Sequence, residues 1–250
     1  MKIIHNEIDK QINFLDERFY QSENSAEFYP SVTTVLDVYP KGAGFIQWLK
    51  DLGNNADDVV KRAAESGSKV HNAIDQYLQG NTIEWQTKSN INYTLEEWLM
   101  ILKFVEFFGT HKPKVIANEL QLVSDKLKLG GTIDLVCMIG DKTWLIDYKT
   151  SNAIHTSYEL QMAAYAVMWN EAYPNQKIDK TGVMWLKANT KGEDKTQKKI
   201  QGKGWQLKEF ERNYLKAYKL FEHTRAIWDE ENPTYTPKNK IYPSEVTLKL

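Results

Sequence analysis

Cysteine is nearly absent from this sequence, which has only Cys137 among its 250 residues. A lone cysteine cannot form an internal disulfide, and it cannot build a multi-cysteine zinc or iron–sulfur site within one chain. Proteins without disulfides are typical of reducing compartments, so we expect a cytoplasmic protein.

Glycine and proline are also scarce, with 13 and 7 residues respectively. This low usage argues against a disordered or linker-like chain. No apolar run reaches the roughly 18 residues that a membrane-spanning helix needs, so we expect no membrane interaction. The N-terminal segment carries acidic residues and no long apolar run, which is not the pattern of a secretory signal.

The chain has no excess of either charge, since 32 basic and 33 acidic residues leave a net charge of −1. Proteins that coat themselves in nucleic acid are usually strongly basic. Any nucleic-acid contact is therefore expected to be a local patch or groove. The balance does not exclude a nucleic-acid enzyme, because such an enzyme also needs acidic metal ligands.

The hydrophobic pattern predicts an α/β fold in which a central mixed sheet is flanked by helices. Helices are expected over 55–78, 94–108, 157–173 and 207–228. Strands are expected over 115–123, 129–140, 143–151 and 182–188. The first three strands are separated by short turns, which predicts an antiparallel meander to which the fourth strand is added.

We expect a single domain over 1–250, because no Pro-, Gly- or Ser-rich linker divides the chain. It would consist of an N-terminal hairpin and helical region of about 1–112 and a core of about 113–232. The hairpin is expected within 14–35, followed by a short helix with Ser31 as its N-cap. Gly67 predicts a break or kink in the first long helix, since glycine weakens a helix interior.

Two carboxylates and a lysine are concentrated in the middle strands. Side chains alternate along a strand, so Asp147 and Lys149 point to one face, and the hairpin can bring Asp134 next to Asp147. Two carboxylates 4 Å apart repel by about 4 kcal/mol at an effective dielectric of about 20. A bridging divalent cation or protonation of one acid removes that repulsion. A cross-strand salt bridge on a solvated face is the plainer alternative.

Four further residues have a plain interpretation when each is taken alone. Glu119 would be a surface acid on an amphipathic strand, and His71 a histidine at the edge of the core. Gln161 and Tyr165 share one helix face, where Tyr165 would simply pack in the core. Packing does not explain why all of them occur in this order and spacing.

Together these residues make the chain resemble the RecB-like nucleases of the PD-(D/E)xK superfamily. The matching motifs are Gly67-x-x-x-His71, Gly131-x-x-Asp134, Asp147-x-Lys149-Thr150 and Gln161-x-x-x-Tyr165. The upstream segment 30–33 and Trp48 extend the resemblance to phage exonucleases and the mitochondrial genome-maintenance exonuclease, and it covers roughly 28–190. The chain departs from many members in having Asp147 where they have Glu, and in lacking the four-cysteine iron–sulfur cluster that some members carry.

The resemblance implies a restriction-endonuclease-like core and a role for each matching residue. His71, Asp134, Asp147 and the main-chain carbonyl of Tyr148 would hold one or two Mg²⁺ or Mn²⁺ ions, and a histidine ligand favours Mn²⁺. Lys149 would position the attacking water, and Glu119 would be an outer ligand. The residues expected to contact DNA near the scissile phosphate are Thr150, Gln161 and Tyr165.

A basic segment follows the last predicted strand. Residues 187–203 contain six lysines and two acidic residues. The glycines of this segment predict a flexible loop. Its lysines are candidate phosphate contacts: Lys191, Lys195, Lys198 and Lys199. The alternative is a solvated hairpin tip, since charge runs are usually just solvated.

The sequence therefore predicts a metal-dependent DNA exonuclease that acts on single-stranded DNA or DNA ends in replication, recombination or repair. An endonuclease of the same fold and a catalytically silent nucleic-acid-binding module remain alternatives. Because no Gly-x-x-x-x-Gly-Lys-[Ser/Thr] motif is present, ATP use is not expected. A recombination or replication protein is the expected protein partner.

Overall fold

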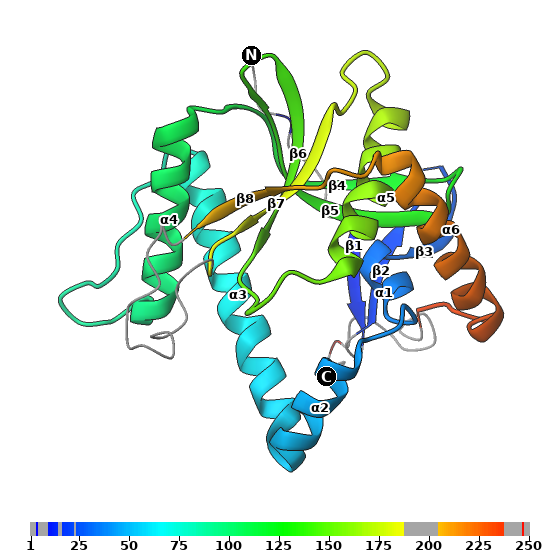
Figure 1. Ribbon diagram of the computed structural model, residues 1–250, viewed down its shortest axis with the longest axis horizontal. Helices are drawn as coiled ribbons and strands as arrows, with labels where there is room; N and C mark the ends of the chain where they lie inside the picture. Colours follow the sequence, from blue (N-terminus) through cyan, green and yellow to red (C-terminus); the bar gives the residue numbers. More distant parts are fainter. Residues whose placement is uncertain are drawn as a thin grey trace.

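A five-stranded mixed sheet forms the centre of the protein, in the order β4-β5-β6-β7-β8 (Figure 1). The computed structural model describes residues 4, 10–14, 17–22, 24–187, 205–237 and 247. The strands are β4 (Lys114–Ser124), β5 (Leu129–Ile139), β6 (Lys142–Lys149), β7 (Lys180–Trp185) and β8 (Gln206–Glu209). β4, β5 and β6 form an antiparallel meander, β7 pairs parallel with β6, and β8 pairs antiparallel with β7. The predicted antiparallel meander with a further strand is confirmed.

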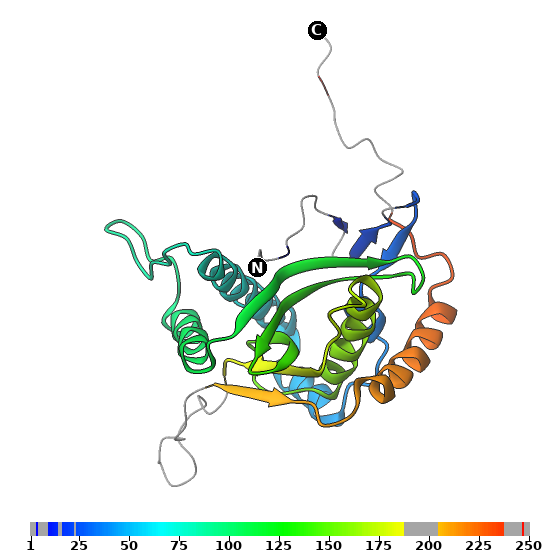
Figure 2. The same cartoon turned by 90° about the horizontal axis from the view of Figure 1, so that it is seen from above.

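Helices cover both faces of this sheet (Figure 2). α5 (Thr156–Ala172) is the crossover that the parallel pair β6–β7 requires, and it packs with α1 (Val32–Leu36) and α6 (Tyr214–Glu231). α3 (Ala56–Leu78) and α4 (Leu95–His111) pack against the opposite face. Because side chains alternate along β6, Leu145 belongs to the α5 side of the core and Ile146 to the α3 side.

A small N-terminal sheet lies against β5. Its strands are β1 (Gln11–Phe14), β2 (Glu17–Gln21) and β3 (Phe28–Pro30), and the predicted hairpin is the antiparallel pair β2–β3. A Cβ on Gly130 would lie 2.2 Å from the Cβ of Tyr20, so glycine lets the two sheets approach each other. Ser31 is the N-cap of α1 and accepts a hydrogen bond of 2.9 Å from the Thr34 backbone N–H, as predicted.

Two predicted details are wrong. α3 runs unbroken through Gly67, whose missing side chain instead makes room for Thr150: a Cβ there would lie 3.1 Å from Thr150 Oγ1. The helix expected over 207–228 begins only at Tyr214, because Gln206–Glu209 pairs with the edge of β7 as β8. Pairing with a distant strand overrides the local pattern in that short segment.

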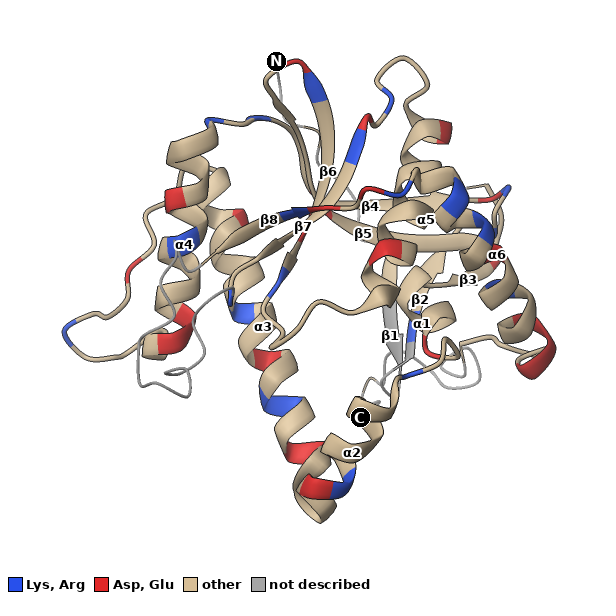
Figure 3. Ribbon diagram, viewed as in Figure 1, with Lys and Arg blue, Asp and Glu red and all other residues tan. Residues whose placement is uncertain are grey.

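α2 (Ala43–Leu52) and the 3₁₀ turn η1 (Gly53–Asn55) lead into α3 and extend away from the sheet (Figure 1). Acidic and basic residues alternate along α3, in keeping with the balanced net charge (Figure 3). None of the helices in the described ranges is long and apolar enough to cross a membrane.

Candidate metal centre and active site

Three candidate metal ligands meet where α3 approaches β4 and β5. Ligand atoms of His71, Glu119 and Asp134 all lie within 4.8 Å of one another. His71 Nδ1 is 3.7 Å from Glu119 Oε1 and 3.5 Å from Asp134 Oδ2. Within the described part of the chain, Glu119 Oε1 is buried and has no hydrogen-bond partner. A buried carboxylate oxygen in this state is costly. The cluster therefore fits a divalent cation, which Glu119 Oε1 would coordinate.

The orientation of the His71 ring favours a role as a ligand. His71 Nε2 lies 3.0 Å from the carbonyl oxygen of Tyr148. In the tautomer with its proton on Nε2, the ring donates to that carbonyl and turns the Nδ1 lone pair toward Glu119 and Asp134. Metal-binding histidines are commonly fixed in this way by a hydrogen bond from the other nitrogen.

Asp134 and Tyr148 are joined directly. The Tyr148 backbone N–H donates a 2.7 Å hydrogen bond to Asp134 Oδ2. The register that pairs Leu135 with Ile146 puts Asp134 opposite Asp147 at the next position, as the sequence predicted from the hairpin. The hydrogen bond thus holds the Asp134 carboxylate against the backbone of β6, within the metal cluster.

An unusual backbone conformation brings Glu119 into the cluster. The register of β4 shifts between Val115 and Ala117, and Glu119 has a φ of 45°. This left-handed conformation is uncommon for a residue other than glycine and is often found at functional sites. It turns the Glu119 carboxylate toward His71 in the middle of a strand.

A buried asparagine holds the segment that carries Glu119. The Asn118 side chain is fully buried, donates to the carboxylate of Asp75 and accepts a 3.4 Å hydrogen bond from the Tyr148 hydroxyl. Asp75 lies one helical turn after His71 on α3. Asn118 therefore ties α3, β4 and β6 together beside the metal cluster. The sequence analysis missed Asn118 and Asp75, although the spacing of Asp75 from His71 was a signal.

A second set of contacts surrounds the lysine on β6. Lys149 Nζ lies 2.7 Å from Asp147 Oδ2 and donates a 3.0 Å hydrogen bond to Gln161 Oε1. The Gln161 Nε2 amide donates a 3.0 Å hydrogen bond to Asp147 Oδ1. Lys149 Nζ also lies 4.3 Å from the ring centroid of Tyr158, a cation–π contact that the sequence analysis missed. One amide from α5 thus fixes both charged groups.

The charges of the two sets act on each other. Burial and the negative charge of Asp147 raise the pKa of Asp134 well above its usual value. Burial by itself lowers the pKa of His71, but the charges of Asp134 and Glu119 outweigh it and raise that pKa to about 9. Burial likewise opposes the charge on Lys149, yet Asp147 keeps its pKa above the usual value. The site without a cation therefore carries crowded negative charge, which a cation would relieve.

Comparison with known proteins decides the family. The family model of the PD-(D/E)XK nuclease superfamily matches residues 45–235, about three quarters of the chain, and this range includes every residue of the cluster. The chain belongs to the PD-(D/E)XK nuclease superfamily. No curated protein matches the chain. Members of the superfamily are nucleases that use divalent metal ions, so the superfamily implies a nucleic-acid substrate, and the predicted fold class is confirmed.

The residues that carry the sequence resemblance occupy adjoining positions in the structure. Asp147 and Lys149, the predicted acid-x-Lys motif, lie at the end of β6, and Asp134 lies across the hairpin on β5. Gln161 and Tyr165 are both buried on α5. A Cβ on Gly131 would lie 2.4 Å from Tyr165 Cε1, so the glycine of that motif allows the tyrosine to pack against β5.

The remaining predicted site residues fall in two groups. Thr150 directly follows β6 and faces Gly67 of α3, which places it beside the candidate site. Four candidate DNA-contacting lysines lie outside the described residues: Lys191, Lys195, Lys198 and Lys199. Their role as phosphate contacts stays a prediction.

Proposed function

We propose that this nuclease is a Mg²⁺- or Mn²⁺-dependent DNA exonuclease that acts on single-stranded DNA or DNA ends during replication, recombination or repair. The observation that carries the proposal is the pairing of two adjoining sets of residues. One set, His71, Glu119 and Asp134, fits a divalent cation, and the other holds a charged lysine beside it. The resemblance to RecB-like nucleases, including phage exonucleases, supports the finer assignment to DNA and to ends.

The residues that would hold the cation are those nearest the orphaned oxygen of Glu119. His71, Glu119 and Asp134 supply an imidazole nitrogen and two carboxylates. Asp147 and the carbonyl of Tyr148 adjoin them and would complete the ligand set. A carbonyl oxygen has two lone pairs, so Tyr148 can accept from His71 and still act as a ligand. A bound divalent cation supplies Lewis-acid stabilisation of phosphate charge and lowers the pKa of a water.

Lys149 acts on the water and on the phosphate. Its ammonium is held charged by Asp147 and oriented by Gln161, so its remaining donor can orient a water molecule for in-line attack. The same positive charge offsets the negative charge that develops in a phosphoryl transition state. Asp147 and Gln161 fix the lysine before the substrate binds, which reduces the reorganisation needed during reaction.

The contacts to DNA belong to the same proposal. Thr150, at the rim, offers its hydroxyl to a phosphate oxygen. Gln161 and Tyr165 act close to the scissile phosphate. Gln161 also hydrogen-bonds Asp147 and Lys149, so it connects the residues near the phosphate to both charged groups. The lysines of 187–203 would track the backbone through non-specific charge contacts.

Cleavage assays on end-labelled linear DNA and on covalently closed circular DNA test the function. Purified protein should degrade linear single-stranded DNA in Mg²⁺ or Mn²⁺, leave covalently closed circles intact, and stop in excess chelator. Linear RNA of the same sequence measures the preference for DNA. Cutting of closed circles would establish an endonuclease in place of an exonuclease. Binding without any cleavage in either metal would indicate a silent binding module.

A further inference from the structure

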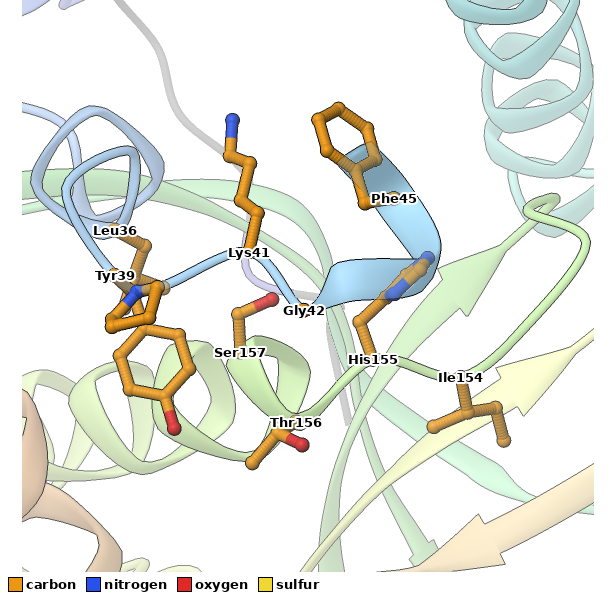
Figure 4. A pocket seen from close by; sticks show the side chains of 10 residues that line it. Leu36, Tyr39, Lys41, Gly42, Phe45, Ile154, His155, Thr156 and Ser157 are labelled. Atoms are coloured by element: carbon orange, nitrogen blue, oxygen red, sulfur yellow. The ribbon is translucent and has the colours of Figure 1, made fainter. Parts of the chain in front are cut away.

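A pocket of about 450 Å³ lies between α2 and the start of α5 (Figure 4). Its walls come from the α1–α2 connection, the first turn of α2 and residues 154–157 ahead of and within α5. The volume falls within the roughly 300–1,000 Å³ typical of small-molecule sites. None of the superfamily motifs contributes a side chain to it.

The pocket adjoins the candidate active site through two aromatic rings. The ring of His155, which lines the pocket, has its centroid 5.2 Å from that of Tyr158. The ring centroid of Tyr158 in turn lies 4.3 Å from Lys149 Nζ. One side chain therefore separates the pocket from the catalytic lysine. A strand that crosses Lys149 would reach the pocket with its neighbouring nucleotide.

The chemistry of the pocket suits a nucleotide. Tyr39, Phe45 and His155 offer aromatic rings, and the hydroxyls of Thr156 and Ser157 lie at the first turn of α5. Aromatic rings stack on the π-face of any base, and hydroxyls and helix N-termini suit phosphate oxygens.

Charge in the pocket favours an anion. None of the residues that line it is acidic, and Lys41 Nζ lies 5.4 Å from the ring centroid of Phe45. Lys41 also forms an exposed pair with Asp37 at 3.6 Å, which is weak enough to be exchanged for a phosphate.

A second pocket provides a contrast on the other side of the loop that follows β6. It measures about 590 Å³ and is lined by Thr150 and Ser151 and by as many basic as acidic side chains: Arg62, Lys69, Lys187, Glu65, Glu96 and Glu97. The charges of this lining balance, Lys187 is already paired with Glu96 at 2.7 Å, and no aromatic side chain lines the pocket. The acid-free pocket at Phe45 is therefore the better site for an anionic, aromatic ligand.

We propose that the pocket at Phe45 binds one nucleotide of the substrate strand next to the scissile phosphate. Its base stacks on Phe45 and His155, and its phosphate meets Lys41 and the first turn of α5. The inference rests on the proposed function, because it takes a nucleic-acid strand as the substrate. A free mononucleotide has the same chemistry, so the experiment includes both.

Binding measured in chelator tests the pocket separately from cleavage. The probe is a short fluorescent single-stranded oligodeoxyadenylate, titrated with wild-type protein and with Phe45→Ala. No residue of α2 is buried, so the substitution should leave the fold intact. We expect affinity to fall about tenfold, the scale of one lost base–aromatic stack. Ile46→Ala is the matched control, since Ile46 is the next residue, half exposed and outside the pocket.

Salt dependence tests the phosphate contact. Lys41→Ala should lower the slope of log affinity against log salt by about 0.7, the loss of one single-strand phosphate contact. Lys50→Ala, which changes a lysine of the adjoining helix α2 that lies outside the pocket, should leave the slope unchanged. Competition by deoxyadenosine monophosphate that disappears in Phe45→Ala would show that the pocket also accepts a free nucleotide.

The outcomes separate this inference from the nuclease proposal. Equal affinities of wild type, Phe45→Ala and Ile46→Ala would overturn the nucleotide pocket, whatever the cleavage result. Equal losses in Phe45→Ala and Ile46→Ala would also overturn it, because the effect would then belong to α2 as a whole. Phe45-dependent binding by a protein that cleaves no DNA in Mg²⁺ or Mn²⁺ would support the pocket and overturn the nuclease.

Discussion

A single amide organises the charged groups of the site at the residue scale. Gln161 donates to Asp147 and accepts from Lys149, with both hydrogen bonds at 3.0 Å. Hydrogen bonds to charged groups are stronger than neutral ones, and a residue that makes two of them fixes both partners. Gln161 thereby orients the lysine on which the proposed reaction depends.

Replacing Gln161 by leucine should separate positioning from packing. We expect Gln161→Leu to lower the cleavage rate by about 10- to 100-fold, because Lys149 loses its fixed orientation. The free energy of unfolding should fall by roughly 1–3 kcal/mol, as expected for buried hydrogen bonds to charges. Gln47→Leu, which removes an exposed hydrogen bond to Asp51, is the control and should change neither quantity. Cleavage at the wild-type rate by Gln161→Leu would contradict this role.

The site residues were predictable from the sequence only where regular geometry places them. Strand alternation and the hairpin predicted that Asp134, Asp147 and Lys149 lie together, and the register agrees. Glu119 joins the cluster through a φ of 45°, and that conformation breaks the alternation from which a sequence is interpreted. Asn118, which holds this segment, resembles any other polar strand residue until its partners on α3 and β6 are known.

At the element scale, Asn118 connects three elements beside the metal cluster. We expect Asn118→Leu to weaken Mn²⁺ binding by about 10- to 100-fold, the usual cost of losing a residue that orients metal ligands. Isothermal titration calorimetry measures this affinity. Thr94→Ala is the control, because it removes the N-cap of α4 and should cost about 1 kcal/mol of stability without altering Mn²⁺ affinity. Equal Mn²⁺ affinities in wild type and Asn118→Leu would contradict the connection.

Close contact between α5 and β5 depends on Gly131. A Cβ there would lie 2.4 Å from Tyr165 Cε1, so Gly131→Ala must push the tyrosine or the strand aside. We expect a loss of about 1–3 kcal/mol in the free energy of unfolding, measured by chemical denaturation. Gly44→Ala lies in α2, where an added Cβ meets nothing within 4 Å, and should be neutral or stabilising. Wild-type stability in Gly131→Ala would show that this contact is not needed.

Helices and strands were predictable from the sequence where a hydrophobic pattern runs over many residues. Short segments whose structure depends on pairing with another strand were less predictable. The periodic segment 55–78 became α3, and the short turn expected after β5 is a hairpin turn in which Gly140 has a positive φ of 63°. The short segment Gln206–Glu209 became β8 because the edge of β7 offers hydrogen bonds to it. Gly67 lies within an unbroken α3, contrary to the prediction. Its missing side chain makes room for Thr150, and no local pattern shows a contact with a residue so far along the chain.

At the scale of the whole molecule, the candidate site is formed by residues from elements that are far apart in sequence and that pack against the central sheet. α3 brings His71 against one side of β4 and β5, while α5 brings Gln161 to the end of β6. The nucleotide pocket has the same origin, since α2 and the start of α5 meet only in the folded chain. The motifs predicted the superfamily and the fold class, but no local pattern marked that pocket. Folding and metal binding should therefore be coupled.

Thermal unfolding with and without Mn²⁺, run beside cleavage, tests the central claim that His71, Glu119 and Asp134 hold a catalytic divalent cation. At a concentration 100 times its Kd, Mn²⁺ should stabilise the wild type by about 2.7 kcal/mol, or roughly 5–10 °C in Tm. Asp134→Asn should fold, because the amide oxygen can still accept from the Tyr148 N–H and the repulsion from Asp147 is relieved. We predict that Asp134→Asn loses both the Mn²⁺-dependent rise in Tm and the cleavage of linear DNA. A wild-type Tm shift together with undiminished cleavage in purified Asp134→Asn would contradict the account.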